Sequence, residues 1–492
     1  MIRHDGQKTA TISNTMSKFY VTTSIPYVNA VPHLGHAMEF LQADVLARYH
    51  RQMGDTVFFS TGCDEHGSKI AEKAAEQGMT PLEFSSQNVV AFTKLLQQLQ
   101  ITNDAFIRTT DPDHEKRAQV IWQNLQPYIY KNLYVGLYCV GCEEFVTEKI
   151  AKANNNICPS HNRAYEQIEE ENYFFALSKF TEQIKLEIES DEFLVIPETR
   201  KHEILRVLED GLDDISISRS KEKLTWGVAV PKDPTQVMYV WFEALLNYIT
   251  VLGYPDAVQF KEFWPADVQI IGKDILRFHA AIWPGLLLAL GLHLPKKLYV
   301  HGFITSDGQK MSKSLGNVVA PSEIINTYGV DAFRYFFLRH IPSYSDGDFT
   351  SRRFIAAYNA ELANELGNSV QRVAAMIGKY QDNIIGEIPP SEHDIHEYQV
   401  AMQNCRFDKA LDEVWEQVRG LNQYIDAEKP WMIAKENDTQ HLQEILAYCV
   451  SNLLEIASLL APFMPQSATA IANMFSDGIV RPLAAPLFPK HD

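Results

Sequence analysis

The 492-residue chain has few cysteines, no excess of basic charge and no long apolar run. Six cysteines over this length are too few for a disulfide scaffold. The 44 basic side chains against 62 acidic ones give a formal net charge of -18, which excludes the overall basic coat of a non-specific DNA binder. Apolar runs stay shorter than the roughly 18 residues that a transmembrane helix needs. We therefore expect no membrane contact, and any nucleic-acid contact has to come from a local patch.

The first 16 residues are polar and lack the apolar stretch of a secretory signal peptide. We interpret residues 1–16 as a disordered N-terminal extension, or as the product of an upstream start codon with Met16 as the true start. The few basic residues also allow a weak transit-peptide interpretation, against which Asp5 counts. Without a secretion signal, we expect a cytoplasmic protein.

Strand and helix patterns alternate in the first part of the chain. Residues 19–24 and 56–60 are rich in β-branched and aromatic side chains, which indicates strands, and a loop and a helical pattern follow each of them. Further strands are predicted at residues 238–241, 268–271 and 297–304. This alternation predicts a parallel α/β sheet, interrupted by an insertion at about 118–220 and followed from about residue 350 by helices alone.

The segment Pro32-His33-Leu34-Gly35-His36 lies between a predicted strand and the start of a predicted helix. A helix N-terminus offers free N–H groups to a phosphate, and glycine allows a nucleotide to approach the backbone closely. The two imidazoles can donate hydrogen bonds to phosphate oxygens. By itself the tetrapeptide HLGH is only a weak indication of a nucleotide site.

A second segment, SDGQKMSKSLGN, carries Lys310 and Lys313 between two glycines. Two cations in a mobile loop suit the charge that develops on a leaving pyrophosphate. A solvated basic loop is the plain alternative.

The cysteines include one pattern with metal-ligand spacing. Cys139-x-x-Cys142 is followed after fifteen residues by Cys158-x-x-His161, which matches a structural zinc site with a closed tetrahedral shell. Two incidental pairs or a disulfide are the alternatives. The other cysteines, Cys63, Cys405 and Cys449, are interpreted as small core side chains.

The order HLGH and then KMSKS on an α/β chain resembles the two signatures of class I aminoacyl-tRNA synthetases. Over about residues 17–485 the chain resembles the methionyl-tRNA synthetase family, through segments that include SIPYVNAVPHLGHA, TGCDEHG, YVWFEALLNYI, IIGKDILRFH and ANELGNSVQR. Another class I synthetase, or a catalytically silent tRNA-binding paralogue, are the alternatives; the intact HLGH and KMSKS segments argue against the second.

The resemblance implies a two-step ligation of L-methionine to tRNA(Met), for translation initiation and elongation. Methionine attacks Mg2+-ATP to give methionyl adenylate and pyrophosphate, and the tRNA then takes the methionyl group with release of AMP. His33 and His36 would stabilise the α- and β-phosphates, and Lys310 and Lys313 the β- and γ-phosphates. Gly35 and Asp274 would also contact ATP, Asp274 on its ribose or adenosine side.

The resemblance also implies an aromatic, largely apolar methionine pocket with one carboxylate, Asp64, for the substrate ammonium. The other residues implied in this pocket are Ser24, Ile25, Tyr27, Trp241, Ala244, Leu245, Tyr248, Ile275, Phe278 and His279. From spacing alone, Trp241, Ala244 and Tyr248 look like the core face of a helix. His66, next to Asp64, is interpreted as shaping the loop.

In the helical region, Asn368 and Arg372 lie opposite an apolar stripe and are by themselves a solvated polar pair. The resemblance implies that they and Trp431 contact the tRNA anticodon. It further implies one structural Zn2+ and a monomer, because no dimerising domain follows the helices.

We therefore predict a Rossmann-type α/β catalytic domain with a zinc-binding insertion, followed by an all-α anticodon-binding bundle. The predicted parts are the N-terminal extension (1–16), the first half of the Rossmann domain (17–117), the connective insertion (118–220), the second half of the Rossmann domain (221–300), the KMSKS loop with a stem-contact region (301–350) and the helical anticodon-binding domain (351–492).

Overall fold

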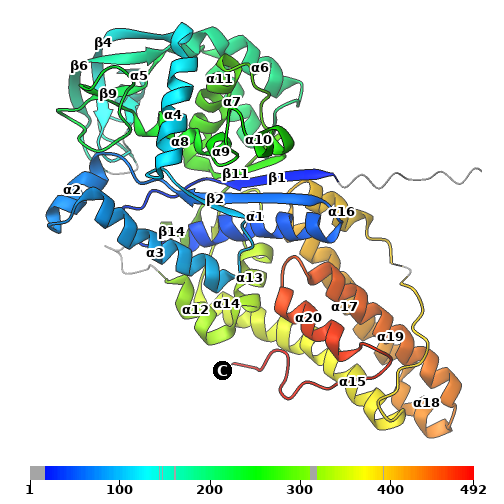
Figure 1. Cartoon of the computed structure of the whole chain (residues 1–492). Helices are drawn as coiled ribbons and strands as arrows, with labels where there is room; N and C mark the ends of the chain where they lie inside the picture. Colours follow the sequence, from blue (N-terminus) through cyan, green and yellow to red (C-terminus); the bar gives the residue numbers. More distant parts are fainter. Residues whose placement is uncertain are drawn as a thin grey trace, which may run out of the picture.

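The computed structural model describes residues 17–142, 144–146, 148–159, 162–310, 319–391 and 393–491. The expected N-terminal extension, His161 and Lys313 lie outside these ranges. The described chain is elongated, with the strands in one part and a helical bundle at the other end (Figure 1). Within the described residues, none of the helices combines the length and the apolar character that crossing a bilayer requires.

A six-stranded parallel sheet forms the centre of the first part. Its strand order is β3-β2-β1-β11-β12-β7, and every neighbouring pair is parallel. The strands are β1 (Lys18–Thr23), β2 (Thr56–Cys63), β3 (Ala105–Arg108), β7 (Leu194–Ile196), β11 (Val268–Gly272) and β12 (Lys297–His301). The chain builds outward from β1 on one side and returns on the other, so the order reverses between β1 and β11. Ligands of open α/β sheets bind at the carboxyl ends of strands at such a point.

Successive residues of β1 face opposite sides of the sheet, as a period of two dictates. Phe19 and Val21 pack into a core that runs under α1 (Leu34–Gln52) and continues into the C-terminal helices. Tyr20 faces a second core. Figure 1 shows α1 lying along one face of the sheet, with α4 and α8–α11 on the other. The sheet therefore separates two cores, and one of them is shared with the helical part.

The strands predicted at 19–24, 56–60 and 268–271 are confirmed as β1, β2 and β11, and the helices between them carry local sequence signals as well. The side chain of Thr80 accepts from the N–H of Glu83, whose carboxylate accepts from the N–H of Thr80, so a capping box starts α3 (Pro81–Leu99). The remaining helices here are α2 (Ser68–Glu76), α4 (Pro112–Asn124), α6 (Thr181–Glu189), α7 (Glu198–Glu209), α8 (Val240–Leu245), α9 (Asn247–Thr250), α10 (Val258–Phe263) and α11 (Trp283–Ala289).

A separate antiparallel sheet of order β5-β4-β6-β8 lies beyond the parallel sheet. Its strands are β4 (Ile129–Cys139), β5 (Glu144–Val146), β6 (Glu166–Phe175) and β8 (Ile215–Ser216), and α5 (Glu148–Ala153) follows β5. Residues 118–220 also supply β7, which pairs with β12 at the edge of the parallel sheet. The insertion and the Rossmann part thus share a sheet.

The predicted strand at 238–241 is wrong beyond Met238, the only one of these residues that belongs to a strand. Strand β10 (Gln236–Met238) pairs with β9 (Ser218–Ser220), antiparallel and outside the six-stranded sheet, and α8 begins at Val240. A short apolar run does not by itself distinguish a strand from a buried helix. The helix places Trp241 and Ala244 at the sheet edge instead.

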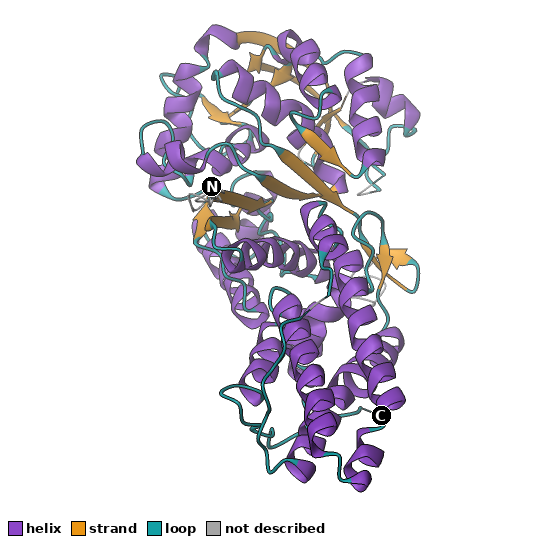
Figure 2. Ribbon diagram, turned by 90° about the vertical axis from the view of Figure 1, so that its right-hand side faces the viewer, coloured by secondary structure: helices purple, strands orange, loops and turns teal. Residues whose placement is uncertain are grey.

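The C-terminal part is helical (Figure 2). Before it, β13 (Ile304–Ser306) pairs with β14 (Gln309–Lys310) and β15 (Gly347–Asp348). The helices that follow are α12 (Pro321–Tyr328), α13 (Val330–Arg339), α14 (Ser351–Ala357), a π-helix (Tyr358–Gly367), α15 (Asn368–Tyr380), α16 (His396–Gln403), α17 (Phe407–Glu428), α18 (Pro430–Glu436), α19 (Thr439–Leu460) and α20 (Pro465–Met474).

Candidate active site

A cavity of about 570 Å³ opens where β1 and β11 end and α1 begins. Its wall contains fourteen of the residues that the sequence predicted for ATP or methionine, and they come from segments far apart in the chain. They are Ser24, Ile25, Tyr27, His33, Gly35, His36, Asp64, Trp241, Ala244, Leu245, Tyr248, Asp274, Ile275 and His279. The fold thus brings the residues predicted for ATP and those predicted for methionine together around one cavity.

The two histidines of HLGH are stacked at the N-terminus of α1. Their ring centroids are 3.8 Å apart with the planes 15° from parallel. The N–H of Gly35 donates to Nδ1 of His33 (3.1 Å), and the N–H of His33 donates to Nδ1 of His36 (3.2 Å). Because each Nδ1 accepts, the proton of each neutral ring is on Nε2, the nitrogen that can donate to a phosphate oxygen. A Cβ at position 35 would lie 3.0 Å from the His33 ring, so glycine suits this close turn.

Burial and the neighbouring His33 and His301 hold the pKa of His36 well below its usual value. His36 is therefore neutral at pH 7, so its ring can offer a hydrogen bond but no positive charge.

One turn further along α1, Glu39 organises the floor of the cavity. Its carboxylate accepts from the N–H and the hydroxyl of Ser24, both at 2.6 Å, and pairs with Nε2 of His301 at 3.0 Å. Burial opposes the charge of His301, but the hydrogen bond and charge of Glu39 outweigh it and raise the pKa of His301.

Glu39 and His301 were not predicted from the sequence, although both line the cavity. Glu39 lies three residues after His36 on the same helix face, a spacing that could have indicated it. His301 ends β12, the strand next to β11, and only the strand order brings it here.

One wall of the cavity is aromatic. Trp241 and Phe278 stack with centroids 3.8 Å apart and planes 12° from parallel. Phe278 is not itself among the lining residues; it backs Trp241. The Tyr248 hydroxyl lies 2.8 Å from Nε2 of His279, whose Nδ1 lies 3.0 Å from the carbonyl oxygen of Ile275.

Burial lowers the pKa of His279 to about 4, so this ring is neutral at pH 7. With the proton on Nδ1 donating to Ile275, Nε2 accepts from the Tyr248 hydroxyl. The result is an apolar wall with one fixed hydroxyl–imidazole pair, which suits an uncharged, polarisable side chain.

Asp64 stands on a loop that is fixed on both flanks. Its N–H donates to the carbonyl of Pro26 (2.9 Å) and its carbonyl accepts from the N–H of Val28 (3.1 Å). The next residue, Glu65, is buried and its carboxylate is held by Arg108 at 2.6 and 2.7 Å. These bonds hold the backbone of Asp64 at the cavity wall.

At the far end of the cavity, Asp274 follows Gly272, the last residue of β11. A Cβ at position 272 would lie 2.7 Å from the Asp274 carboxylate, so only glycine leaves that side chain in place. Lys310 ends β14, and Lys313 lies outside the described residues. The placement of these two lysines at the ATP site therefore stays a prediction.

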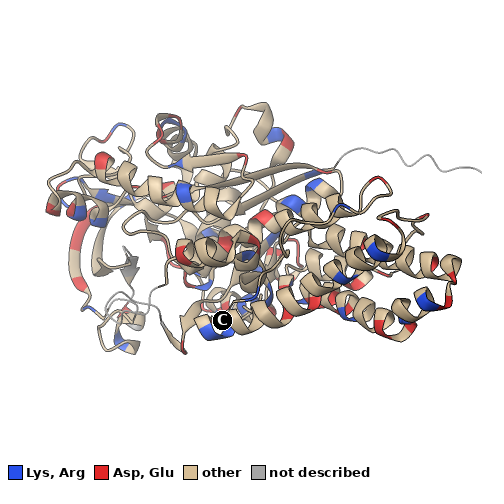
Figure 3. Ribbon diagram, turned by 90° about the horizontal axis from the view of Figure 1, so that it is seen from below, with Lys and Arg blue, Asp and Glu red and all other residues tan. Residues whose placement is uncertain are grey.

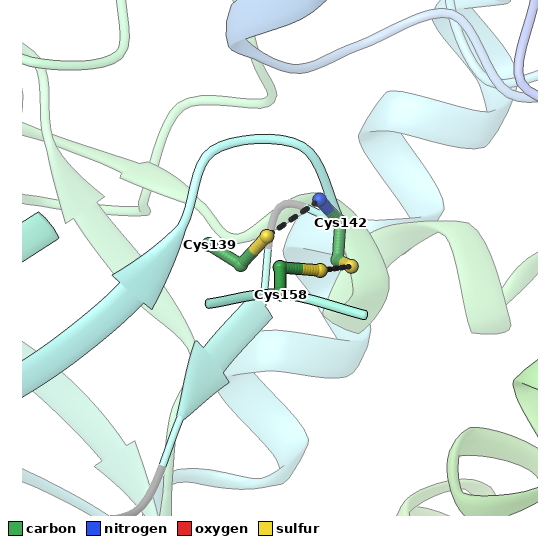
Figure 4. Close-up of side chains that lie close together, drawn as sticks. All are labelled: Cys139, Cys142 and Cys158. Carbon is green, nitrogen blue, oxygen red and sulfur yellow. Dashed lines mark hydrogen bonds between the residues drawn. The ribbon is translucent and has the colours of Figure 1, made fainter. Parts of the chain in front are cut away.

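Three cysteines converge at the edge of the antiparallel sheet (Figure 4). The Sγ atoms of Cys139, Cys142 and Cys158 lie within 4.8 Å of one another, with Cys142 and Cys158 at 3.5 Å. The N–H of Cys142 donates to Sγ of Cys139 at 3.3 Å. Zinc–sulfur bonds of about 2.3 Å in a tetrahedron place sulfurs at such separations, so the cysteines fit a zinc ion.

Burial raises the pKa values of the Cys139 and Cys142 thiols. Thiolates here therefore need a cation to compensate them. Gly141 and Cys142 also line the cavity, and the Lys69 ammonium donates to the carbonyl of Gly141. No sequence pattern indicates this contact between the cysteine cluster and the cavity.

The residues predicted to contact RNA lie in the helical bundle. Asn368 begins α15 and is exposed, and the Arg372 guanidinium lies 2.7 Å from Asp426. The same guanidinium lies 6.0 Å from the centroid of the Trp431 ring. Trp431 is half-buried, with one side packed against the bundle core. Basic and acidic residues are mixed along these helices (Figure 3).

Comparisons with known proteins agree with this arrangement. Residues 19–170 and 154–374 match the family described as tRNA synthetases class I (M), and residues 392–481 match the anticodon-binding domain of tRNA ligases. The methionine–tRNA ligase of Thermotoga maritima is 41% identical over 478 residues, which cover 93% of this chain and 75% of that protein. The methionine–tRNA ligase of Brucella melitensis is 37% identical, covering 96% of this chain and 98% of its own length.

Among solved structures, the methionyl-tRNA synthetase of Mycobacterium tuberculosis in complex with methionyl-adenylate superimposes with a TM-score of 0.89. It is 33% identical, and the match covers 96% of this chain and all of that one. The parallel sheet, the HLGH turn and the helical anticodon-binding domain define a class I aminoacyl-tRNA synthetase. Within that class the chain belongs to the methionyl-tRNA synthetases and is a methionine–tRNA ligase.

Proposed function

We propose that the chain activates L-methionine with Mg2+-ATP and transfers the methionyl group to tRNA(Met) at the cavity between β1 and β11. The methionine carboxylate is ionised at pH 7 and attacks the α-phosphorus without a general base. The reaction therefore depends on positioning and on stabilisation of the phosphate charge.

At one end of the cavity, Asp64 pairs with the substrate ammonium, and the aromatic wall receives the thioether. Trp241, backed by Phe278, offers a flat polarisable surface, and the Tyr248–His279 pair bounds the depth of the pocket. Ser24, Ile25, Tyr27, Ala244, Leu245 and Ile275 complete the enclosure. A thioether gains from aromatic contact and needs no charged partner.

At the other end, the Nε2–H groups of His33 and His36 donate to the α- and β-phosphates, and the N-terminus of α1 adds its partial positive charge. Asp274 binds the ribose or adenosine side. Lys310 and Lys313 bind the β- and γ-phosphates. When bound with ATP, Mg2+ neutralises phosphate charge.

The zinc site is structural. Cys139, Cys142, Cys158 and His161 hold one Zn2+, whose role is to keep the loop next to the cavity folded. Asn368, Arg372 and Trp431 bind the anticodon. We further propose that the enzyme serves both translation initiation and elongation, in the cytoplasm and as a monomer. The division of the chain into six parts also stays a prediction.

The observation that carries the proposal is the single cavity that holds both HLGH and the aromatic wall with Asp64. The test is ATP–pyrophosphate exchange by the purified chain with each of the twenty amino acids, without tRNA. We expect exchange with methionine alone, followed by charging of tRNA(Met). Absence of exchange both with and without tRNA would overturn the proposal and favour the silent paralogue.

A further inference from the structure

A buried carboxylate lies between two buried imidazoles directly behind the cavity. Oε1 of Glu243 lies 2.9 Å from Nδ1 of His66, and Oε2 lies 2.9 Å from Nε2 of His114. All three side chains are within 2% of complete burial. None of the three is among the residues that line the cavity.

Each member of this cluster stands on a different element. Glu243 lies in α8 between Trp241 and Ala244, two residues of the cavity wall. His66 is two residues after Asp64. His114 belongs to α4, and its Nδ1 lies 2.8 Å from the Thr250 hydroxyl. The Glu243 carboxylate is thus a bridge from the aromatic wall to the loop that carries Asp64.

The loop from Asp64 to His66 is fixed by a separate partner at each residue. Asp64 is held through its backbone, Glu65 by Arg108, and His66 by Glu243. Of these three partners, only Glu243 stands on α8, the helix that supplies Trp241, Ala244 and Leu245.

The charges in the cluster strengthen the link between His66 and Glu243. Burial opposes ionisation of His66, but Glu243, Glu115 and Asp64 together raise its pKa to about 10. Burial likewise opposes the Glu243 carboxylate, and His66 and His114 outweigh it and lower its pKa. A buried ion pair with additional hydrogen bonds holds a fixed geometry and is sensitive to loss of either partner.

We propose that Glu243 is a positioning residue for methionine binding: through His66 it sets the separation between the Asp64 carboxylate and the Trp241 wall. This inference rests on the proposed methionine site. Methionine must place its ammonium and its thioether at the same time, so a small displacement of the loop from α8 weakens its binding without changing the ATP end.

The test compares the KM values of methionine and ATP in pyrophosphate exchange. Glu243→Gln keeps the shape but puts an amide N–H₂ where one imidazole N–H needs an acceptor. We expect the KM of methionine to rise about tenfold or more, with the KM of ATP within about twofold of wild type. Direct methionine binding, followed by tryptophan fluorescence, should weaken by the same factor.

Two variants separate positioning from loss of stability. His66→Gln breaks the link to the loop and should match Glu243→Gln, and the double variant should be no worse than either single one, because both remove the same link. His114→Gln leaves that link intact and should raise the KM of methionine much less. If Glu243→Gln does not fold, the KM of methionine in His66→Gln is compared with that in His114→Gln. A larger rise in His66→Gln then supports the positioning role, and equal rises overturn it.

Glu170→Gln is the matched control. Its carboxylate is also buried and is held by Arg219 at 3.0 and 3.1 Å, in β6 away from the cavity. The positioning role would be overturned if Glu243→Gln and Glu170→Gln had the same KM for methionine. It would also be overturned if Glu243→Gln raised the KM of methionine and the KM of ATP by the same factor. A wild type without methionine-dependent exchange would instead overturn the proposed function, so the two failures are distinguishable.

Discussion

The hydroxyl of Tyr248 and Nε2 of His279 lie 2.8 Å apart, fully enclosed in the aromatic wall of the cavity. Burial keeps the His279 imidazole neutral, and the hydrogen bond from its Nδ1 to the carbonyl of Ile275, at 3.0 Å, fixes the orientation of the ring. The polar atoms of the pair are thus satisfied by one another and by Ile275, which suits a wall that receives an uncharged side chain.

The buried neutral His279 should make the folded state sensitive to acid. Its pKa is lowered by burial to about 4, against about 6.5 in the unfolded chain. Above pH 6.5 the stabilisation is fully present. As the pH falls from 6.5 towards 4, the unfolded state takes up a proton that the folded state excludes, and the free energy of unfolding falls by about 1.4 kcal/mol per pH unit.

Urea unfolding at pH 7 and pH 5 tests this. Between pH 7 and pH 5, the free energy of unfolding of the wild type should fall by about 2 kcal/mol more than that of His279→Gln. His202→Gln, at an exposed histidine, should behave as the wild type. The same loss in all three proteins would contradict the prediction.

Arg334 should be essential to the junction between the sheet and the helical bundle. Its guanidinium is fully buried, lies 2.7 Å from Asp44 of α1, and donates to the carbonyls of Phe463 and Pro462 at 2.6 and 2.9 Å. Arg334→Met leaves the two carbonyls without this donor and removes one of the two cations beside Asp44, so it should lower the free energy of unfolding by about 3–5 kcal/mol. Thermal unfolding measures this, with Arg481→Met, at an exposed ion pair with Asp477, as a control that should change by less than about 1 kcal/mol.

The purified chain should contain one zinc per molecule by elemental analysis. Cys158→Ser should lose the metal and lower the melting temperature, because the remaining ligands no longer fill the tetrahedral shell. Cys449→Ser, at a buried cysteine in α19 far from the cluster, should keep its zinc. Full zinc content in Cys158→Ser would refute the site.

Arg372 should matter for tRNA and not for adenylate formation. Arg372→Met removes the cation beside Trp431 and should raise the KM of tRNA(Met) about tenfold, with pyrophosphate exchange unchanged. Lys409→Met, which breaks an exposed pair with Asp412 at the start of α17, is the control. A parallel loss of exchange would show that Arg372 acts on the fold rather than on the RNA.

The sequence by itself determined the local elements and the short-range sites. Strand β1, helix α1 with HLGH at its start, and the Cys139–Cys142 pair all depend on contacts within a few residues, which the pattern contains. The segment at 238–241 shows the limit, because an apolar run of four residues fits a strand or a buried helix equally well.

Only the tertiary structure decided which distant residues meet. The strand order puts His301 of β12 next to Glu39 of α1, and the packing of α8 against α4 and the loop after β2 puts Glu243 between His66 and His114. These pairs are separated by 129 to 262 positions, and no local pattern carries such a contact. Burial makes these pairs necessary, because a charged group in the core is stable only next to a group that compensates its charge. The tertiary fold determines which residue lies close enough to do so.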